Sequence, residues 1–452
     1  MTKRWWLLIG LVGVLSIVGW RSLGISAGYI THGPSIAAGI GAKLLCSAEH
    51  VSGMSREQAF EDVRQYSPIL NELTVTYDQE HDAVTASFWG ISEKTARYIE
   101  GLGCAITFSD TDARNQITTV ATTKSDAPWP LGSRADTIDP SLQVHVADIV
   151  REDNALGLNT RALLVVHKGR IVAEAYDQGA GPATPLLGWS MAKSLTAIML
   201  GNLELKGMVD LSLSPGFPGW DQDARRTITT SHLLTMTDGL DFLETYEPGD
   251  NATIMLFDTP SASDYAMQAP ASSTPGERYN YSSGTANLLA RHYQDLLGSP
   301  QAAYDAFFQS IYEPLGMQNA VLEVDPSGTF VGSSYFYASA RDWARMGQLM
   351  LNGGELMGRR VVSEDWVLRA TTPNTSTNNK AYGYQWWLNR GNEELRFPLL
   401  PEDAYFANGN RQQTVMVIPS EDAVIVRLGW TSGAYPIDIN VRSILDLLAD
   451  AS

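Results

Sequence analysis

Two apolar hairpin patterns, far apart in the chain, constrain the fold more than any other feature. Residues 162–167 and 170–176 flank a Lys-Gly turn, and residues 414–418 and 423–428 flank a polar turn. Runs of Val, Ile, Leu and Ala around a short turn are typical of paired strands. Helical patterns fill the sequence between the two hairpins. We therefore expect an antiparallel sheet that brings together strands from both ends of this region.

The length of 452 residues predicts two or three structural units. We assign residues 1–22 to a signal segment, 23–125 to a small α+β unit, and 126–452 to the main domain. The main domain is expected to be α+β, with its antiparallel sheet flanked by helices and joined to a helical region. Its helices are expected at about 190–206, 229–237, 284–297, 301–312 and 340–352.

Local patterns describe the small unit before the sheet. Ser55 and Gln58 form a capping-box pattern, which opens a short helix. Residues 73–77 and 83–88 alternate with period two around a polar turn, which predicts a hairpin. Ser92 is expected to cap a second helix that ends at a pair of glycines. A polar stretch with two prolines then marks the boundary to the main domain.

The first 22 residues carry the pattern of a targeting signal. Lys3 and Arg4 precede a mostly apolar run over residues 5–20, which Arg21 closes. As a helix this run spans about 24 Å, short of the roughly 30 Å hydrocarbon core of a bilayer. It predicts a signal peptide or a signal anchor. We therefore expect an exported protein, either periplasmic or anchored to the membrane and facing the periplasm, and both alternatives stay open.

The two cysteines, Cys46 and Cys104, are the only pair in the chain. In an oxidising periplasm they are expected to form one disulfide, with two buried free thiols as the alternative. Two cysteines are too few for a four-cysteine zinc site. The seven histidines show no spacing typical of metal ligands, and His232 is expected to be an ordinary core residue. We predict no metal and no other cofactor.

The charge excludes one class of partner. Lys and Arg total 32 against 50 Asp and Glu, which gives a net charge of −18 at pH 7. Such an acidic chain repels phosphate backbones, so nucleic acid is not an expected partner. Lysine itself is scarce, with eight residues in the whole chain. One of them, Lys193, stands in a chemically informative position.

Ser190-Met-Ala-Lys193 is the sharpest chemical signal. If Ser190 begins a helix, Lys193 lies one turn further on the same face. A buried lysine near a helix N-terminus has a lowered pKa, so its neutral amine can accept the serine proton. The Ser190 backbone N–H can serve as one oxyanion donor. The alternative is a capping serine beside a surface lysine, because this spacing arises by chance about once or twice in such a chain.

Two further loops can complete an acyl-transfer site. A turn-rich loop before a predicted helix presents Tyr281, whose phenol can pass a proton to a leaving group. A packing tyrosine is the alternative. Gly409 precedes a predicted strand and permits close backbone approach. The N–H of Asn410 is therefore a candidate second oxyanion donor.

Six motifs follow one another along the main domain. They are Ser190-Met-Ala-Lys193, the 228–239 segment ITTSHLLTMTDG, Pro275-Gly with Tyr281-Ser-Ser-Gly284, Pro314-Leu-Gly-Met317, the 341–347 segment RDWARMG, and the 382–387 segment YGYQWW. In this order they resemble the serine β-lactamase-like hydrolases, over about residues 130–450. The chain is most similar to the 6-aminohexanoate-dimer hydrolase branch, near class C β-lactamases and family VIII esterases.

The resemblance implies a β-lactamase/transpeptidase-like fold and a serine hydrolase that cleaves a small-molecule amide or ester through an acyl-enzyme. It implies Ser190 as the acylated nucleophile, Lys193 as the proton acceptor and Tyr281 as the proton relay. It also implies the backbone N–H groups of Ser190 and Asn410 as the oxyanion hole. Substrate contacts are expected from residues beside the motifs: Trp189, Tyr246, Ser283, Tyr335, Trp386 and Gly409. For the aromatic members, core packing is the alternative.

Two departures from class C β-lactamases bear on the substrate. Those enzymes carry Tyr-x-Asn, whereas the third position here is Ser283. They also carry Lys-Thr-Gly on the final strand, whereas Ala407-Asn408-Gly409 offers no cation for a β-lactam carboxylate. An amide or ester without that carboxylate therefore fits better than an antibiotic.

Three other functions compete with this interpretation. An α/β-hydrolase elbow is matched by Gly24-Ile-Ser26-Ala-Gly28, but no strand precedes it and no histidine follows His292. A penicillin-recognising sensor that acylates without efficient turnover stays open as an alternative. A weak β-lactamase stays open as well.

Overall fold

The expected antiparallel sheet is present and joins strands from both ends of the main domain. The computed structural model describes residues 27–109, 112–135 and 137–450. Its largest sheet has six strands in the order β12-β13-β14-β15-β5-β6, so the C-terminal hairpin pairs with the N-terminal one. The strands are β12 Trp387–Leu388, β13 Tyr405–Gly409, β14 Gln413–Ile418, β15 Ala423–Gly429, β5 Thr160–His167 and β6 Arg170–Tyr176. Both predicted hairpins are confirmed.

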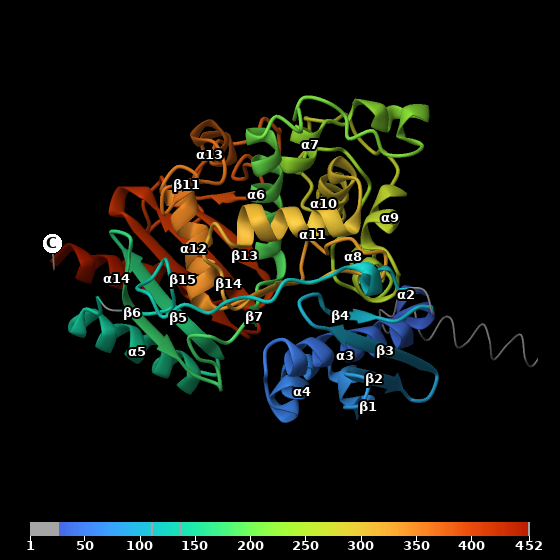
Figure 1. The fold of residues 1–452 in the computed structure, drawn as a ribbon, viewed down its shortest axis with the longest axis horizontal. Helices are drawn as coiled ribbons and strands as arrows, with labels where there is room; N and C mark the ends of the chain where they lie inside the picture. Colours follow the sequence, from blue (N-terminus) through green and yellow to red (C-terminus); the bar gives the residue numbers. More distant parts are fainter. Residues whose placement is uncertain (1–26, 110–111, 136, 451–452) are drawn as a thin grey trace, which may run out of the picture.

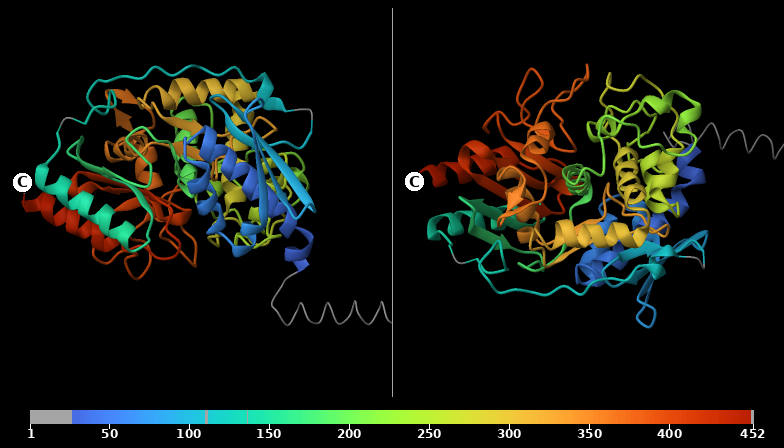
Figure 2. Two further views of the ribbon diagram at one scale, coloured as in Figure 1. Left: turned by 90° about the horizontal axis from the view of Figure 1, so that it is seen from below. Right: turned by 45° about the horizontal axis from the view of Figure 1, so that its top comes forward.

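Helices cover both faces of this sheet (Figure 1). Helices α5 (Pro140–Ala155) and α14 (Ile437–Asp450) lie side by side on the outer face, as Figure 2 shows at left. Helix α12 (Ala340–Leu351) packs on the inner face against β14, β15 and β5. Gly347 makes this close approach possible, because a Cβ there would lie 2.5 Å from Val424 Cγ1. Strands β5, β14 and β15 are therefore buried on both faces, whereas β6 forms the edge of the sheet.

The helical region lies beyond α12 and surrounds α6 (Ala192–Leu205), which is buried along almost its whole length. A helix that is apolar on all sides requires such a position. The other helices are α7 Thr230–Leu234, α8 Asn251–Phe257, α9 Ala262–Met267, α10 Ser283–Leu297, α11 Pro300–Phe307 and α13 Glu364–Ala370. The five helices predicted in this domain correspond to α6, α7, α10, α11 and α12. Two small sheets complete it: β7 (Leu186–Leu187), β9 (Phe336–Ala338) and β8 (Ala320–Leu322), and the pair β10 (Glu355–Leu356) and β11 (Arg359–Arg360).

The N-terminal unit is a four-stranded sheet packed on one long helix. Its strands run in the order β1-β2-β3-β4 (Leu73–Asp78, Ala83–Phe88, Ser92–Ile99 and Gly103–Ile106). Helices α2 (Ala27–Thr31), α3 (Gly33–His50) and α4 (Arg56–Arg64) and the turn η1 (Pro68–Glu72) precede them. The predicted hairpin is confirmed, and Ser55 caps α4 by accepting a 3.2 Å hydrogen bond from the Gln58 amide.

The helix expected after Ser92 is wrong, because this segment is strand β3. Its Glu, Lys, Ala and Arg residues favour a helix locally. However, it pairs with β2 on one side and with β4 on the other, and Ala96 is fully buried between them. Tertiary pairing therefore overrides the local preference.

The predicted disulfide is present. Cys46 on α3 and Cys104 on β4 are joined, with their Cα atoms 6.0 Å apart and a sequence separation of 58. Both residues are fully buried. The bond therefore ties the long helix to the far edge of its sheet.

Replacing Cys46 and Cys104 together by alanine is expected to lower the free energy of unfolding by about 4 kcal/mol, because the unfolded chain then regains the freedom of a long loop. Urea denaturation followed by circular dichroism measures the change. A reducing agent should produce the same loss in the native chain and none in the double variant. An unchanged urea midpoint in the variant would contradict the expectation.

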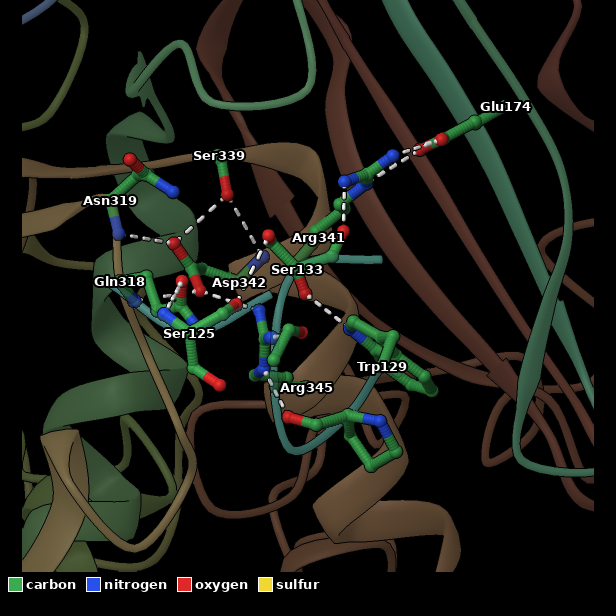
Figure 3. A network of polar contacts seen from close by, with 12 residues as sticks. Ser125, Trp129, Ser133, Glu174, Gln318, Asn319, Ser339, Arg341, Asp342 and Arg345 are labelled. Atoms are coloured by element: carbon green, nitrogen blue, oxygen red, sulfur yellow. Dashed lines mark hydrogen bonds and ion pairs between the residues drawn. The ribbon is translucent and has the colours of Figure 1, made fainter. Parts of the chain in front are cut away.

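The segment between the two units is held against α12, and this explains one of the six motifs (Figure 3). Asp342 and Arg345, both buried, form an ion pair of 2.7 Å. Arg345 Nε donates to the Pro130 carbonyl at 3.0 Å, and the Trp129 indole donates to the Arg341 carbonyl at 3.2 Å. The 341–347 motif therefore fastens the connecting segment to the main domain.

The proposed signal segment of residues 1–22 lies outside the described residues. None of the helices in the described part of the chain combines the length and apolar character that a membrane span needs.

Candidate active site

Ser190 and Lys193 lie where the chain enters α6. Ser190 is in the one-turn helix η3 (Trp189–Met191), and Lys193 follows in the first turn of α6. Lys193 Nζ is 2.9 Å from Ser190 Oγ. Trp189 adopts a left-handed φ of 48°, which sets the sharp entry into the turn. The sequence spacing therefore brings the two side chains into direct contact, as expected.

The Lys193 amine is buried and has three hydrogen-bond partners. Besides Ser190, it donates to Ser283 Oγ at 3.0 Å and to the Ser333 carbonyl at 3.1 Å. Burial lowers the pKa of Lys193 to about 8, although the Glu244 carboxylate partly opposes this shift. Near neutral pH a useful fraction of this amine is therefore uncharged, which is the form that can accept a proton.

Tyr281 lies next to the same pair. Lys193 Nζ is 4.8 Å from the centre of the Tyr281 ring, which stacks on Trp387 at 5.3 Å between centroids. Burial and the Glu244 carboxylate raise the pKa of Tyr281, while its hydrogen bond with Ser190 opposes them. The phenol is therefore protonated at neutral pH and is suited to relay a proton rather than to act as the base.

The end of the 228–239 motif holds the Tyr281 loop in place. The Asn280 amide donates to the Met236 carbonyl at 2.9 Å, and the Thr285 hydroxyl donates to Asp238 at 2.7 Å. Burial raises the pKa of Asp238 to about 6, and the Thr285 hydrogen bond counteracts this. This motif is thus explained as a support for the loop that carries Tyr281.

Glu244 is a site residue that the sequence analysis missed. Ser283 Oγ donates to Glu244 Oε1 at 2.8 Å while accepting from Lys193, so a chain of hydrogen bonds links the amine to the carboxylate. The Tyr246 hydroxyl donates to the same oxygen at 2.6 Å. Glu244 follows the 228–239 motif by five residues, but no local pattern distinguishes it from a surface acid.

Gly409 and Asn410 approach the nucleophile from the edge of the main sheet. A Cβ on Gly409 would lie 2.0 Å from the Gly188 carbonyl oxygen, so only glycine permits this contact. The close approach brings the backbone of β13 and η7 (Asn410–Gln412) to η3, where the oxyanion donors are expected. Arg411 points away from the site, with its guanidinium 4.2 Å from the centre of the Tyr66 ring.

These elements enclose a hollow of about 390 Å³. It is lined by Ser190, Tyr246, Tyr281, Trp387, Arg396, Asn408, Gly409 and Asn410. Of the expected substrate contacts, Tyr246 and Gly409 are therefore in the wall, and Ser283 lies behind it against Lys193.

The structure does not bring three of the expected aromatic contacts into this wall. Trp386 is fully buried and packs edge-on against Tyr405, and its neighbour Trp387 faces the hollow instead. Tyr335 is buried and donates to the Leu256 carbonyl at 3.1 Å. Trp189 is buried next to Tyr335 and lines a second cavity, described below.

Arg396, like Trp387 and Asn408, lines the hollow without having been expected there. It comes from the long connection between β12 and β13, and its guanidinium lies 4.4 Å from the centre of the Trp387 ring. The strand position of the β-lactamase lysine is occupied by the buried Ala407, as expected. A cation is therefore present in the hollow, but it comes from a different segment.

No group of three or more His, Cys, Asp and Glu side chains in the described residues is placed to hold a metal ion. His232 accepts a hydrogen bond of 3.1 Å from the Thr229 amide and completes the cap of α7. Its role in the described structure is therefore local.

Comparison with known proteins agrees with this architecture. A family model described as Beta-lactamase matches residues 146–439. The 6-aminohexanoate-dimer hydrolase of Paenarthrobacter ureafaciens is 26% identical over 297 residues, which cover 60% of this chain and 72% of that protein.

Two solved structures share the fold. A putative 6-aminohexanoate-dimer hydrolase from Bacillus anthracis has a TM-score of 0.55 and 20% identity, covering 75% of this chain and 87% of its own. A family VIII carboxylesterase has a TM-score of 0.54 and 14% identity, covering 69% of this chain and 99% of its own. The chain therefore belongs to the Beta-lactamase family and is a serine hydrolase of that family.

Proposed function

We propose that this hydrolase cleaves an amide or ester by a two-step acyl transfer through Ser190, Lys193 and Tyr281. One observation carries the proposal: the buried amine of Lys193, whose pKa is lowered to about 8, lies 2.9 Å from Ser190 Oγ. A serine hydroxyl needs a neighbouring base to become a nucleophile. Lys193 is the group in contact with it that can be neutral near pH 7.

In the first step, the Lys193 amine accepts the Ser190 proton as Oγ bonds to the substrate carbonyl carbon. The electron pair of the C=O bond moves to the oxygen, which the N–H groups of Ser190 and Asn410 stabilise. The oxyanion then collapses and breaks the bond to the leaving amine or alcohol. Tyr281 passes its proton to that group and regains one from Lys193.

In the second step, water attacks the acyl-enzyme and the same groups act in reverse. Water gives a proton through Tyr281 to Lys193 as it bonds to the carbonyl carbon. Ser190 Oγ then leaves and recovers a proton from Lys193. The products are an acid and a regenerated serine, so no other reactant is consumed.

The relatives and the residues of the hollow support the proposed substrate class. One relative is a 6-aminohexanoate-dimer hydrolase and one structural neighbour is a carboxylesterase, which supports a linear amide or an ester. The absence of a cation at Ala407 distinguishes this chain from class C β-lactamases. A weak β-lactamase is kept as a secondary candidate, because Arg396 places a cation in the hollow from a different segment.

A turnover experiment tests the proposal. The purified protein is mixed with p-nitrophenyl acetate and with the corresponding anilide, and product release is followed over many enzyme equivalents. Continuous release supports the hydrolase. A burst of one equivalent followed by none would favour the penicillin-recognising sensor, and no release from either compound would refute the acyl-transfer mechanism.

We also propose that the protein is exported and faces the periplasm, with or without a retained membrane anchor. The buried Cys46–Cys104 disulfide supports an oxidising compartment. Immunoblotting of periplasmic, membrane and cytoplasmic fractions tests this location, which recovery in the cytoplasmic fraction would contradict.

Replacing Glu244 by glutamine is expected to shift the pH dependence of kcat/KM to lower pH. The Glu244 carboxylate raises the pKa of Lys193, so its loss lowers that pKa further. The base is active when neutral, and the rising limb of the pH profile moves with its pKa. Ester hydrolysis measured from pH 5 to 10 gives the midpoint.

The matched control is Ser283→Ala, which removes the hydroxyl between the two groups but keeps the charge. It should lower the plateau while shifting the midpoint less than Glu244→Gln. A midpoint unchanged by Glu244→Gln would contradict the role given to the carboxylate.

A further inference from the structure

We propose that the N-terminal unit supplies an acyl chamber, so that the substrates of Ser190 are esters or amides of long, unbranched apolar acids. The inference rests on the proposed function, because it assigns the acyl group of the Ser190 intermediate. The chamber is a cavity of about 410 Å³ between α3 and the main domain. Its apolar wall includes Ile36, Ile40, Leu44, Ile69, Phe88 and Phe257.

The chamber adjoins the catalytic hollow. Tyr246 and Asn410 line both spaces, and Trp189, the neighbour of Ser190, lies in the chamber wall. In this proposal, the acyl chain bonded to Ser190 extends past Tyr246 and Asn410 into the chamber. Asn410 stands at this junction, where its N–H is proposed to stabilise the carbonyl oxygen of the same group.

The arrangement of Tyr281 distinguishes the acyl side from the leaving-group side. Tyr281 and Arg396 line the hollow but are not in the chamber wall. The proposed proton relay has to lie beside the departing amine or alcohol. The leaving group is thus placed on the side of Tyr281 and the acyl chain on the side of Trp189, which leads into the chamber.

The chemistry of the wall suits a hydrocarbon chain. Among the described lining residues, Glu247 is the one with an ionisable carboxyl group, and it accepts a 2.5 Å hydrogen bond from the Tyr29 hydroxyl. The lining also carries polar groups, among them the hydroxyls of Tyr66 and Thr253 and the indole N–H of Trp189, but aliphatic and aromatic carbon makes up most of it. A methylene group takes about the 30 Å³ of a water molecule in the liquid, so the volume accommodates a chain of roughly a dozen carbons.

The wall formed by α3 is a fixed part of the enzyme. Helix α3 packs against α8, and a Cβ on Gly39 would lie 2.3 Å from the Phe257 carbonyl oxygen. Lys43 forms a fully buried ion pair with Glu323 of the main domain. Glu323 also accepts a 2.8 Å hydrogen bond from the Cys104 amide. These contacts fix the chamber in a position to define chain length.

The test measures kcat/KM for p-nitrophenyl acetate, butyrate, octanoate and decanoate with the full-length protein. From butyrate to decanoate we expect kcat/KM to rise by about 100-fold. Complete burial would give about fourfold for each of the six added methylene groups, so the expected rise corresponds to partial burial. The same preference is expected in the rate of covalent labelling by a decyl fluorophosphonate compared with an ethyl one. Labelling depends on acyl-site binding but not on deacylation.

Three variants locate the effect. Ile40→Trp fills the chamber, and Ile69→Asp puts a charge on its rim at a residue that is 42% exposed. Both should lose at least about tenfold on decanoate while acetate stays within about twofold. Ile91→Asp is the matched control, because Ile91 belongs to the same unit, is 70% exposed and lies outside the wall.

Two outcomes overturn the inference while the proposed function stands. One is a rate that does not increase with chain length. The other is a loss in Ile40→Trp and Ile69→Asp that is equal for acetate and decanoate. Failure of the proposed function is distinct, because no ester would then be turned over and neither fluorophosphonate would label Ser190.

Discussion

Replacing Ser190 by alanine is expected to abolish covalent labelling by a fluorophosphonate and to lower kcat for ester hydrolysis by roughly 10⁴- to 10⁶-fold. The hydroxyl oxygen is the atom that bonds to the acyl group in the proposed mechanism, so its loss removes the acyl-enzyme. Intact-protein mass spectrometry detects the phosphonate adduct, and a p-nitrophenyl ester assay gives the rate.

Ser194→Ala is the matched control for this variant. Ser194 is a buried serine in the first turn of α6, but its hydroxyl donates to the Gln385 carbonyl at 2.6 Å and does not face the hollow. The control should keep its labelling and its activity. An adduct that persists in Ser190→Ala would assign the nucleophile to a different residue and refute the mechanism.

The main sheet could be predicted because its signals are local. The 162–176 and 414–428 segments each combine apolar strands with a short turn, and only one sheet could unite them around the helical region. The N-terminal unit was harder. Helix α3 (Gly33–His50) is apolar on nearly all sides and rich in Gly and Ala, so it shows no amphipathic period. Its burial under β2, β3 and α8 is a tertiary effect.

The catalytic pair could be predicted for the same local reason. Ser190 and Lys193 are one turn apart, so the helix alone brings them together. Glu244 and Arg396 reach the site from loops, and no period or spacing marks such residues in advance. Trp386 was expected in the wall where Trp387 is found, because the sequence alone does not say which of two adjacent tryptophans faces the hollow and which is buried.

The loss of the base is expected to separate activity from stability. Lys193→Met should lower the acylation rate by about 10² to 10⁴-fold, which is the usual contribution of a general base. In the native enzyme kcat/KM should rise with pH through about 8, as Lys193 loses its proton. The variant should lack this rising limb. Rapid-mixing measurement of p-nitrophenol release across pH 5–10 gives both quantities.

Lys193→Met should lose activity but gain stability against unfolding at neutral pH. The pKa of Lys193 is about 8 in the folded protein, whereas its ordinary value is 10.5. Below pH 8 the folded protein therefore buries a charged amine, which lowers the free energy of unfolding. The difference between these two pKa values corresponds to at most about 3 kcal/mol of stability at pH 7. Native stability should therefore rise between pH 8 and 10.5 as the unfolded chain alone holds the proton. Lys193→Met should be more stable at pH 7 and lack that rise.

Lys206→Met is the matched control for both measurements. Lys206 follows α6 at its other end, where its amine donates to Ser310 Oγ at 2.6 Å on the protein surface. This variant should keep the activity, the rising limb and the native stability profile. If Lys193→Met retained the native acylation rate, the base would have to be another group. A stability at pH 7 lower than that of the native protein would show instead that the hydrogen bonds of Lys193 to Ser283 and Ser333 outweigh the burial of its charge.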